Sequence, residues 1–177
     1  MARVYFEEVQ SFRQSPWLLM LISVTCFALT IPFLYGLYWQ LIMGEPWGNK
    51  PMSNAALVGT SVSVFVLMGL ILWLIFNIKL HTRIDAQGLH FRFFPNQWRW
   101  QSIMPREIEK YESKVLGFLK TGGRGFHRNS ISKFKAMTIK GNHVIEIKVS
   151  NGYLYRLGTQ DPASFERAMK KMMNPDN

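Results

Sequence analysis

The sequence of 177 residues predicts an α+β membrane protein, in which a two-helix transmembrane hairpin precedes a small antiparallel β barrel or bent sandwich with a C-terminal capping helix. Three observations support this fold class. Two long runs carry no formal charge, the hydrophobic period changes from helical to alternating at Lys79, and the chain ends in a capped amphipathic segment. Charged residues make up only 18% of the chain, compared with about 25% in an ordinary soluble domain.

The charge is divided unequally along the chain. Residues 1–78 carry three basic and three acidic side chains, so their formal charges cancel. Residues 79–177 carry 18 basic and 8 acidic side chains, and therefore the whole net charge of +10. The single cysteine, Cys26, excludes a disulfide framework and a cysteine-based metal site within one chain. The chain thus joins an apolar half to a basic half.

The two uncharged runs predict the helical hairpin. A run of 31 residues follows Arg13, and a run of 28 residues follows Lys50. Each is longer than the roughly 20 apolar residues that cross a bilayer. We therefore expect transmembrane helices over about 16–42 and 53–78, joined by a tight loop at 44–51. The first run is too long for a cleavable signal peptide.

Basic residues near the helix ends predict the orientation of the hairpin. The 44–51 loop contains one basic residue, whereas the opposite ends of the helices are flanked by Arg3, Arg13, Lys79, Arg83, Arg92 and Arg99. Because positively charged flanks stay on the cytoplasmic side, both termini should be cytoplasmic. Residues 1–15 then form a cytoplasmic N-terminal segment, and residues 79–177 form a cytoplasmic β domain.

The residues inside the two runs bear on transport and on helix packing. Neither run contains Asp, Glu, Lys, Arg or His, which argues against a transporter or a pump. Small residues recur at four-residue spacing and would let two helices approach closely. The candidates for this packing are Ala28, Gly36, Ala55, Gly59 and Ser63. The sequence leaves open whether they close the hairpin or join separate copies of the chain.

Alternating hydrophobicity after Lys79 predicts the strands of the β domain. Residues 80–84 and 89–93 alternate apolar with polar side chains, and the turn residues Asp85 to Gly88 lie between them. These two segments form a hairpin. Further strands are expected at 97–101, 107–113, 114–120, 133–140, 143–149 and 153–157.

The last hairpin presents a conflict of register. Asn151 and Gly152 favour a two-residue turn, because both accept the positive φ angles of a type I′ turn. That turn would pair Ile147 with Arg156 and place an arginine on an otherwise apolar face. Either a bulge shifts the register or Arg156 reaches the edge of the sheet.

The chain closes with an amphipathic helix over 162–173. Asp161 is a favourable N-cap, and Pro162 suits the first helical position. The apolar stripe consists of Phe165, Ala168, Met169, Met172 and Met173. A β domain of about 100 residues is long enough to form one core, so we expect it to fold independently.

Three short motifs carry a resemblance to a known family. They are Leu89–Pro95, Gly122–Phe126 and Leu157–Pro162. Together with the order of strands and helix, they resemble small bacterial membrane proteins with a pleckstrin-homology-like (bacterial PH) domain. The glycine motif carries Arg124 where the family pattern has an aromatic residue. The resemblance implies a PH-like β domain in a multi-pass protein of the bacterial inner membrane, with no catalytic residues to transfer.

A basic segment is the strongest candidate for a binding site. Residues 113–145 contain seven basic residues and no Asp or Glu. The candidate residues for binding an anion or a lipid headgroup are Lys120, Arg124, Arg128, Lys133 and Lys135. Attraction to anionic headgroups contributes about 1 kcal/mol for each cation that reaches the surface. A glycine hairpin with a solvated basic rim, or specific recognition of one phospholipid or phosphoprotein, are the alternatives.

Enzymatic function and nucleic-acid binding are less favoured. The four histidines are scattered singly, and neither paired carboxylates nor a nucleophile beside a base stand out, so we expect no metal, no cofactor and no catalysis. Trp98, Arg99 and Trp100 interleave aromatic rings with a cation, as in single-strand binding platforms. A domain tethered to a bilayer, however, meets anionic lipid constantly.

The sequence therefore predicts a non-catalytic, membrane-anchored protein that binds the anionic membrane surface or a protein partner. The alternative is a structural subunit of a homo-oligomeric or larger membrane complex.

Overall fold

The computed structural model describes residues 3–115 and 125–174. The chain forms two compact units: a helical unit of residues 15–76, and a β unit that combines the residues before Ser15 with those from Asn77 onward. The expected segment 114–120 lies mostly outside the described residues, as do the candidates Lys120 and Arg124.

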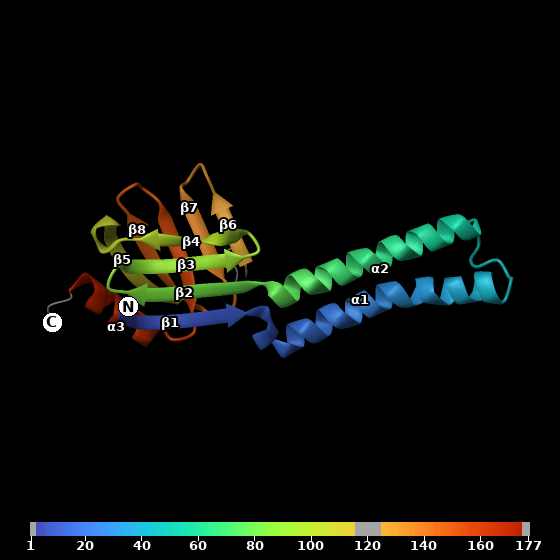
Figure 1. Ribbon diagram of the computed structural model, residues 1–177, viewed down its shortest axis with the longest axis horizontal. Coiled ribbons are helices and arrows are strands. Elements are labelled where there is room, and N and C mark those ends of the chain that lie inside the picture. Colours follow the sequence, from blue (N-terminus) through green and yellow to red (C-terminus); the bar gives the residue numbers. More distant parts are fainter. Residues whose placement is uncertain (1–2, 116–124, 175–177) are drawn as a thin grey trace. The chain divides into compact units, whose positions relative to one another are not determined.

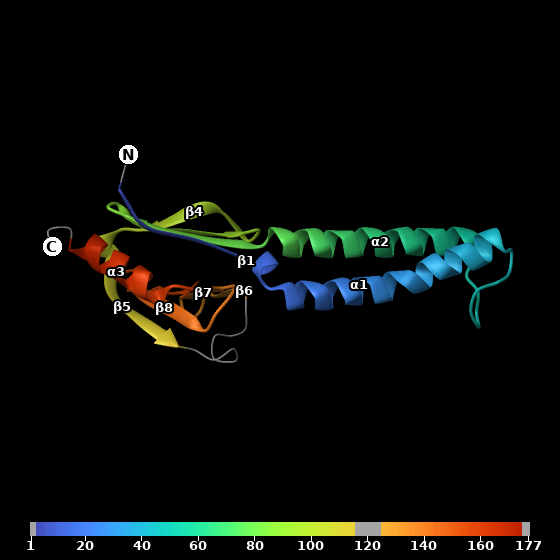
Figure 2. The ribbon, with the colours of Figure 1, turned by 90° about the horizontal axis from the view of Figure 1, so that it is seen from below.

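The helical unit consists of two apolar helices. Helix α1 (Pro16–Leu37) continues as the π-helix η2 (Tyr38–Ile42), and α2 is Asn54–Asn77. The two helices lie side by side and antiparallel (Figures 1 and 2). Both are long and apolar enough to cross a membrane, in agreement with the two predicted helices. Hydroxyl groups within them bond to the preceding turn, as in Ser61 Oγ to Leu57 O at 2.7 Å, so these polar groups need no water.

The structure describes all five candidate residues for helix packing. Ala28, Ala55, Gly59 and Ser63 are exposed on the helical unit. Only Gly36 is buried, and its neighbour is the loop between the helices: a Cβ atom there would lie 2.6 Å from the indole ring of Trp47. Gly36 is therefore a place where the loop packs onto α1.

The β unit contains two sheets that face each other across one core (Figures 1 and 2). The four-stranded sheet has the order β1 (Val4–Ser11), β2 (Lys79–Asp85), β3 (Gly88–Phe94) and β4 (Gln97–Ile103). The five-stranded sheet has the order β5 (Ile108–Val115), β8 (His143–Val149), β9 (Leu154–Thr159), β7 (Phe134–Thr138) and β6 (Gly125–Asn129). Of the two expected forms, a barrel or a bent sandwich, the barrel is wrong because the sheets do not close. The expectation that all strands are antiparallel is also wrong, because β7 pairs with β9 in parallel.

Strand β1 is an element that the sequence pattern does not predict. It pairs antiparallel with β2, so a segment that precedes the helices belongs to the β unit. Glu8 and Gln10 occupy inward positions of β1. Because both are polar, the strand lacks the alternation of apolar and polar residues that would predict it. Gln10 is 1% exposed and donates from Nε2 to Gly158 O at 2.8 Å. Glu8 accepts from Thr159 Oγ1 at 2.7 Å. Polar side chains thus join β1 to the opposite sheet.

The C-terminal helix is confirmed. Helix α3 covers Pro162–Met173, and Asp161 caps it by accepting a hydrogen bond from Ser164 N at 3.0 Å. Its buried residues, which include Phe165 and Met169, complete the core between the sheets. α3 packs against β1 and β2 of one sheet and against β8 of the other.

A bulge resolves the register of the last hairpin. Gly152 has φ +82°, its N–H donates to Val149 O at 2.8 Å, and the Val149 N–H donates to Tyr153 O at 3.0 Å. The loop therefore holds one residue more than a two-residue turn, and Ile147 lies opposite Tyr155. Arg156 lies opposite Glu146 and forms an ion pair with it. The bulge moves Arg156 to the face of the sheet that points away from the core.

Candidate functional site

Of the three described members of the predicted basic site, Lys133 and Lys135 have contacts within the fold. Lys133 Nζ donates to Asn151 O at 3.1 Å. Lys135 is half-buried, and its Nζ lies 5.2 and 5.3 Å from the rings of Tyr153 and Tyr155. Burial, and secondarily the charge of Arg128, lower the pKa of Lys135. Arg128 itself is exposed and lies opposite Lys135 in the β6–β7 pair.

The basic segment also gains acidic neighbours from other parts of the chain. Lys114, which opens the acid-free stretch, forms ion pairs with Glu112 and with Glu146. Glu146 comes from β8, the strand beside β5. The absence of acids along the sequence therefore does not mean an absence of acids in space.

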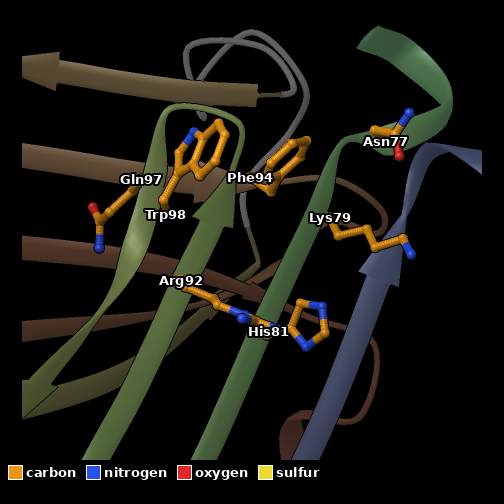
Figure 3. A pocket seen from close by; sticks show the side chains of 7 residues that line it. All are labelled: Asn77, Lys79, His81, Arg92, Phe94, Gln97 and Trp98. Carbon is orange, nitrogen blue, oxygen red and sulfur yellow. The ribbon is translucent and has the colours of Figure 1, made fainter. Parts of the chain in front are cut away.

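A different group of basic residues lines a hollow on the four-stranded sheet. Because Leu80, Phe91 and Phe93 face the core, their neighbours along β2 and β3 point outward. The hollow has a volume of about 440 Å³ and is lined by Asn77, Lys79, His81, Arg92, Phe94, Gln97 and Trp98 (Figure 3). We call it the Lys79–Arg92 hollow. Three of its lining residues are basic and two are aromatic, and none is acidic.

The strand register brings these residues together. Arg92 lies opposite His81, and Lys79 lies opposite Phe94. In Figure 3 the Arg92 side chain reaches toward the His81 ring. The Arg92 guanidinium also lies 4.8 Å from the centroid of the Trp100 ring, within the range of a cation–π contact.

An aromatic pair borders the same hollow. The Phe94 and Trp98 rings are 5.3 Å apart and stand side by side in Figure 3. Trp98 is 72% exposed, although tryptophan is usually among the well-buried residues. The hollow therefore combines positive charge with exposed apolar surface.

The two cations of the hollow form no ion pair within the described residues. Among the residues that the structure describes, neither Lys79 nor Arg92 has a carboxylate oxygen within 4 Å. Burial lowers the pKa of His81, and the charges of Arg92 and Lys79 lower it further, against an opposing effect of Glu7. The two cations that would attract an anion therefore add to the effect of burial in lowering the pKa of His81.

A second set of polar side chains links three segments at the opposite end of the sheet. His90 bonds through Nδ1 to Ser102 Oγ at 2.7 Å and through Nε2 to Asp85 Oδ1 at 3.1 Å. Burial alone would raise the pKa of Asp85, but hydrogen bonds from Gln87 N, His90 and Gly88 N outweigh it and lower the pKa. Sequence reasoning missed this series because its members come from separate segments.

The order of these groups is that of a nucleophile, a base and an acid, but their placement indicates a structural role. Ser102 lies directly opposite His90 in the β3–β4 pair, and Asp85 closes the β2–β3 turn. The series therefore fastens β4 to the hairpin. In the described parts of the chain, no group of three His, Cys, Asp or Glu residues could hold a metal ion.

Comparisons with known proteins do not assign this chain to a family. No protein-family model matches the chain, and neither the curated proteins nor the solved structures include a match. The site therefore has to be interpreted from its own chemistry.

Proposed function

We propose that this chain is a non-catalytic, membrane-anchored protein whose β unit binds the anionic surface of the membrane. The observation that carries the proposal is the Lys79–Arg92 hollow, whose cations have no carboxylate beside them. A surface that leaves cations unpaired next to exposed aromatic rings suits an interface with anionic headgroups.

Chain connectivity supports this assignment. Only Ile78 separates the end of α2 from Lys79, and two residue steps span about 7 Å at most. Four residues separate β1 from α1, and Ser11, the last residue of β1, pairs with Lys79. Both connections to the apolar helices therefore leave from the end of the sheet that carries the hollow.

The proposal includes a location and a fold. α1 and α2 cross the bacterial inner membrane with both termini in the cytoplasm, as the distribution of Lys and Arg predicts. The β unit is PH-like, which is supported by two facing sheets and a C-terminal helix packed between them. Reporter fusions after residue 177 and within 44–51 should report cytoplasm and exterior, respectively; the reverse pattern would contradict the orientation.

Lipid selectivity tests the proposed function. The full chain is equilibrated in mixed micelles with equal amounts of phosphatidylglycerol and phosphatidylcholine, and bound lipids are counted by native mass spectrometry. We expect preferential retention of phosphatidylglycerol, weakening as the salt concentration rises, because the attraction is screened. Equal retention of the two lipids would contradict binding of an anionic surface.

A structural subunit of an oligomer is the second candidate function. The observation that favours it is the exposure of four small residues, Ala28, Ala55, Gly59 and Ser63, on the helical unit. A Cβ atom at Gly59 would meet nothing within 4 Å, so this position is open to another helix. Mass measurement of the native chain and of Gly59→Leu in detergent tests it: an oligomer that dissociates in the variant supports this function, and a monomer excludes it.

A further inference from the structure

We infer that the Lys79–Arg92 hollow binds the phosphate of a lipid headgroup, with Lys79 and Arg92 holding the phosphate oxygens and the Phe94–Trp98 pair contacting the apolar part of the same lipid. This inference rests on the proposed function and gives it a specific site and a ligand class. Its second part is that His81 takes up a proton when the phosphate binds.

The two cations suit a phosphate in complementary ways. Arginine presents a planar fork of donors that matches two phosphate oxygens, and lysine supplies a compact charge. The contact of Arg92 with the Trp100 ring restricts its side chain, which reduces the entropy lost when it binds. A volume of about 440 Å³ lies within the range of small-molecule sites, about 300–1,000 Å³.

The aromatic pair favours a lipid over a free ion. Free inorganic phosphate has no apolar part, and it would make no apolar contact with the Phe94 and Trp98 rings. A phospholipid carries its phosphate next to a glycerol backbone and acyl chains, which can cover the exposed Trp98 ring. Only one residue separates Lys79 from the end of α2, so the chain connects the site directly to the proposed membrane-spanning helix.

The groups that face His81 determine its response to a ligand. They are Glu7 on β1, Lys79 and Arg83 on β2, Arg92 on β3, and the Trp100 ring on β4, 6.1 Å away. Burial and the two cations lower the pKa of His81, and Glu7 opposes them. A bound phosphate adds a negative charge and so favours the imidazolium form. Because the pKa then rises on binding, binding takes up a proton and becomes tighter as the pH falls.

The test uses the full chain in zwitterionic micelles, titrated with short-chain phosphatidylglycerol and followed by tryptophan fluorescence. A phosphodiester keeps the same charge across the titration range of histidine, so a change of affinity with pH comes from the protein. We expect binding to be about fivefold tighter at about pH 6 than at about pH 8. Short-chain phosphatidylcholine and inorganic phosphate are the comparison ligands.

Charge-removing variants locate the site. Lys79→Gln and Arg92→Gln should each weaken binding about fivefold, the effect of losing one cation near the phosphate. Arg92→Lys keeps the charge and should weaken binding less than Arg92→Gln. The matched control is Lys148→Gln, which removes an equal charge from the five-stranded sheet and should leave binding unchanged.

A second pair of variants tests the proton uptake. His81→Asn should bind phosphatidylglycerol with an affinity that no longer rises as the pH falls. His143→Asn, which changes a histidine on β8, should keep the pH dependence. An unaltered pH dependence in His81→Asn would overturn the role of His81.

Other results separate the inference from the proposed function. Salt-sensitive, phosphatidylglycerol-selective binding that survives both charge-removing variants would overturn this site but leave the proposed function standing. Displacement of the lipid by an equal concentration of inorganic phosphate would overturn the lipid as the ligand. Equal binding of phosphatidylcholine in the native chain would overturn the site and the proposed function together.

Discussion

Basic side chains on the outward faces of the two sheets have different surroundings. On the five-stranded sheet, Lys110 pairs with Glu112, Lys148 pairs with Glu109 at 2.8 Å, and Arg156 pairs with Glu146. At the Lys79–Arg92 hollow of the four-stranded sheet, the cations have aromatic neighbours instead of carboxylates. The comparison teaches that the cations of the five-stranded sheet form ion pairs within the fold, whereas Lys79 and Arg92 form none among the described residues.

The same contrast divides the four-stranded sheet. At the end that carries the β2–β3 turn, Asp85 accepts from His90 and lies 3.5 Å from Arg83 Nε. At the end joined to the helices, no acid lines the hollow. Among the described residues, Lys79 and Arg92 therefore form no ion pair at the end of the sheet that the proposed function places at the membrane.

The largest expected effect on stability comes from removing ion pairs on the outward face of the five-stranded sheet. Glu146 is 10% exposed and binds both Lys114 and Arg156, with Arg156 Nε at 2.9 Å. Glu146→Gln should lower the free energy of unfolding by about 2–3 kcal/mol, because the largely buried Arg156 side chain loses the negative charge of Glu146. Denaturant unfolding of the full chain in detergent, followed by near-ultraviolet circular dichroism, measures it.

The control for this variant is Glu109→Gln on the same sheet. Glu109 and Lys148 form an exposed pair, so the change should stay within about 0.5 kcal/mol. Equal stability of Glu146→Gln and the native chain would show that pairing on this face is incidental.

The next effect concerns what holds the four-stranded sheet to its partner. The inward side chains of β1 bond to the opposite sheet, so we expect them to contribute to the free energy of unfolding. Gln10→Leu keeps a similar volume but removes the hydrogen bond that Gln10 donates to Gly158 O and the one that it accepts from Lys140 N. We expect a loss of about 1–2 kcal/mol, measured in the same unfolding experiment. Val9→Ala, on the exposed side of β1, is the control and should cost less.

Acid should weaken the paired groups selectively. Burial by itself raises the pKa of Glu146, but hydrogen bonds from Lys114 and Arg156 outweigh it and hold the pKa below its usual range. A carboxylate whose pKa is lowered by folding stabilises the protein above its unfolded pKa, and this contribution is lost as the pH falls through the folded value. Stability should therefore decline below the ordinary titration range of glutamate, and Glu146→Gln should decline less steeply. If the free energy of unfolding fell equally with pH in the native chain and in Glu146→Gln, other carboxylates would be responsible for the loss.

The elements that the sequence predicts are those with a local signal. The uncharged runs predict α1 and α2, and the pair Asp161 and Pro162 marks the start of α3. Strand β1 gives no such signal, because Glu8 and Gln10 occupy inward positions and their partners lie about 150 residues away in the sequence.

The candidate site illustrates the same limit. A charge count along the chain selects residues 113–145, where acids are missing locally, but Glu146 reaches Lys114 across the β5–β8 pair. The Lys79–Arg92 hollow joins residues of β2, β3 and β4 that become neighbours only once the register is set. The alternation along the sequence places Lys79, His81, Arg92 and Phe94 at outward positions. Only the strand register shows that they are neighbours.

The smallest expected change in stability is at the hollow itself, and it distinguishes the two faces most directly. The double variant Lys79→Gln/Arg92→Gln removes two cations without separating an ion pair, and its main loss is the contact of Arg92 with the Trp100 ring. That contact is worth about 0.5–1 kcal/mol, and relief of repulsion between the two cations offsets part of it. The free energy of unfolding should therefore change by less than about 1 kcal/mol, while retention of phosphatidylglycerol falls. A loss as large as that of Glu146→Gln would mean that the unpaired cations serve the fold after all, and the contrast between the two faces would no longer hold.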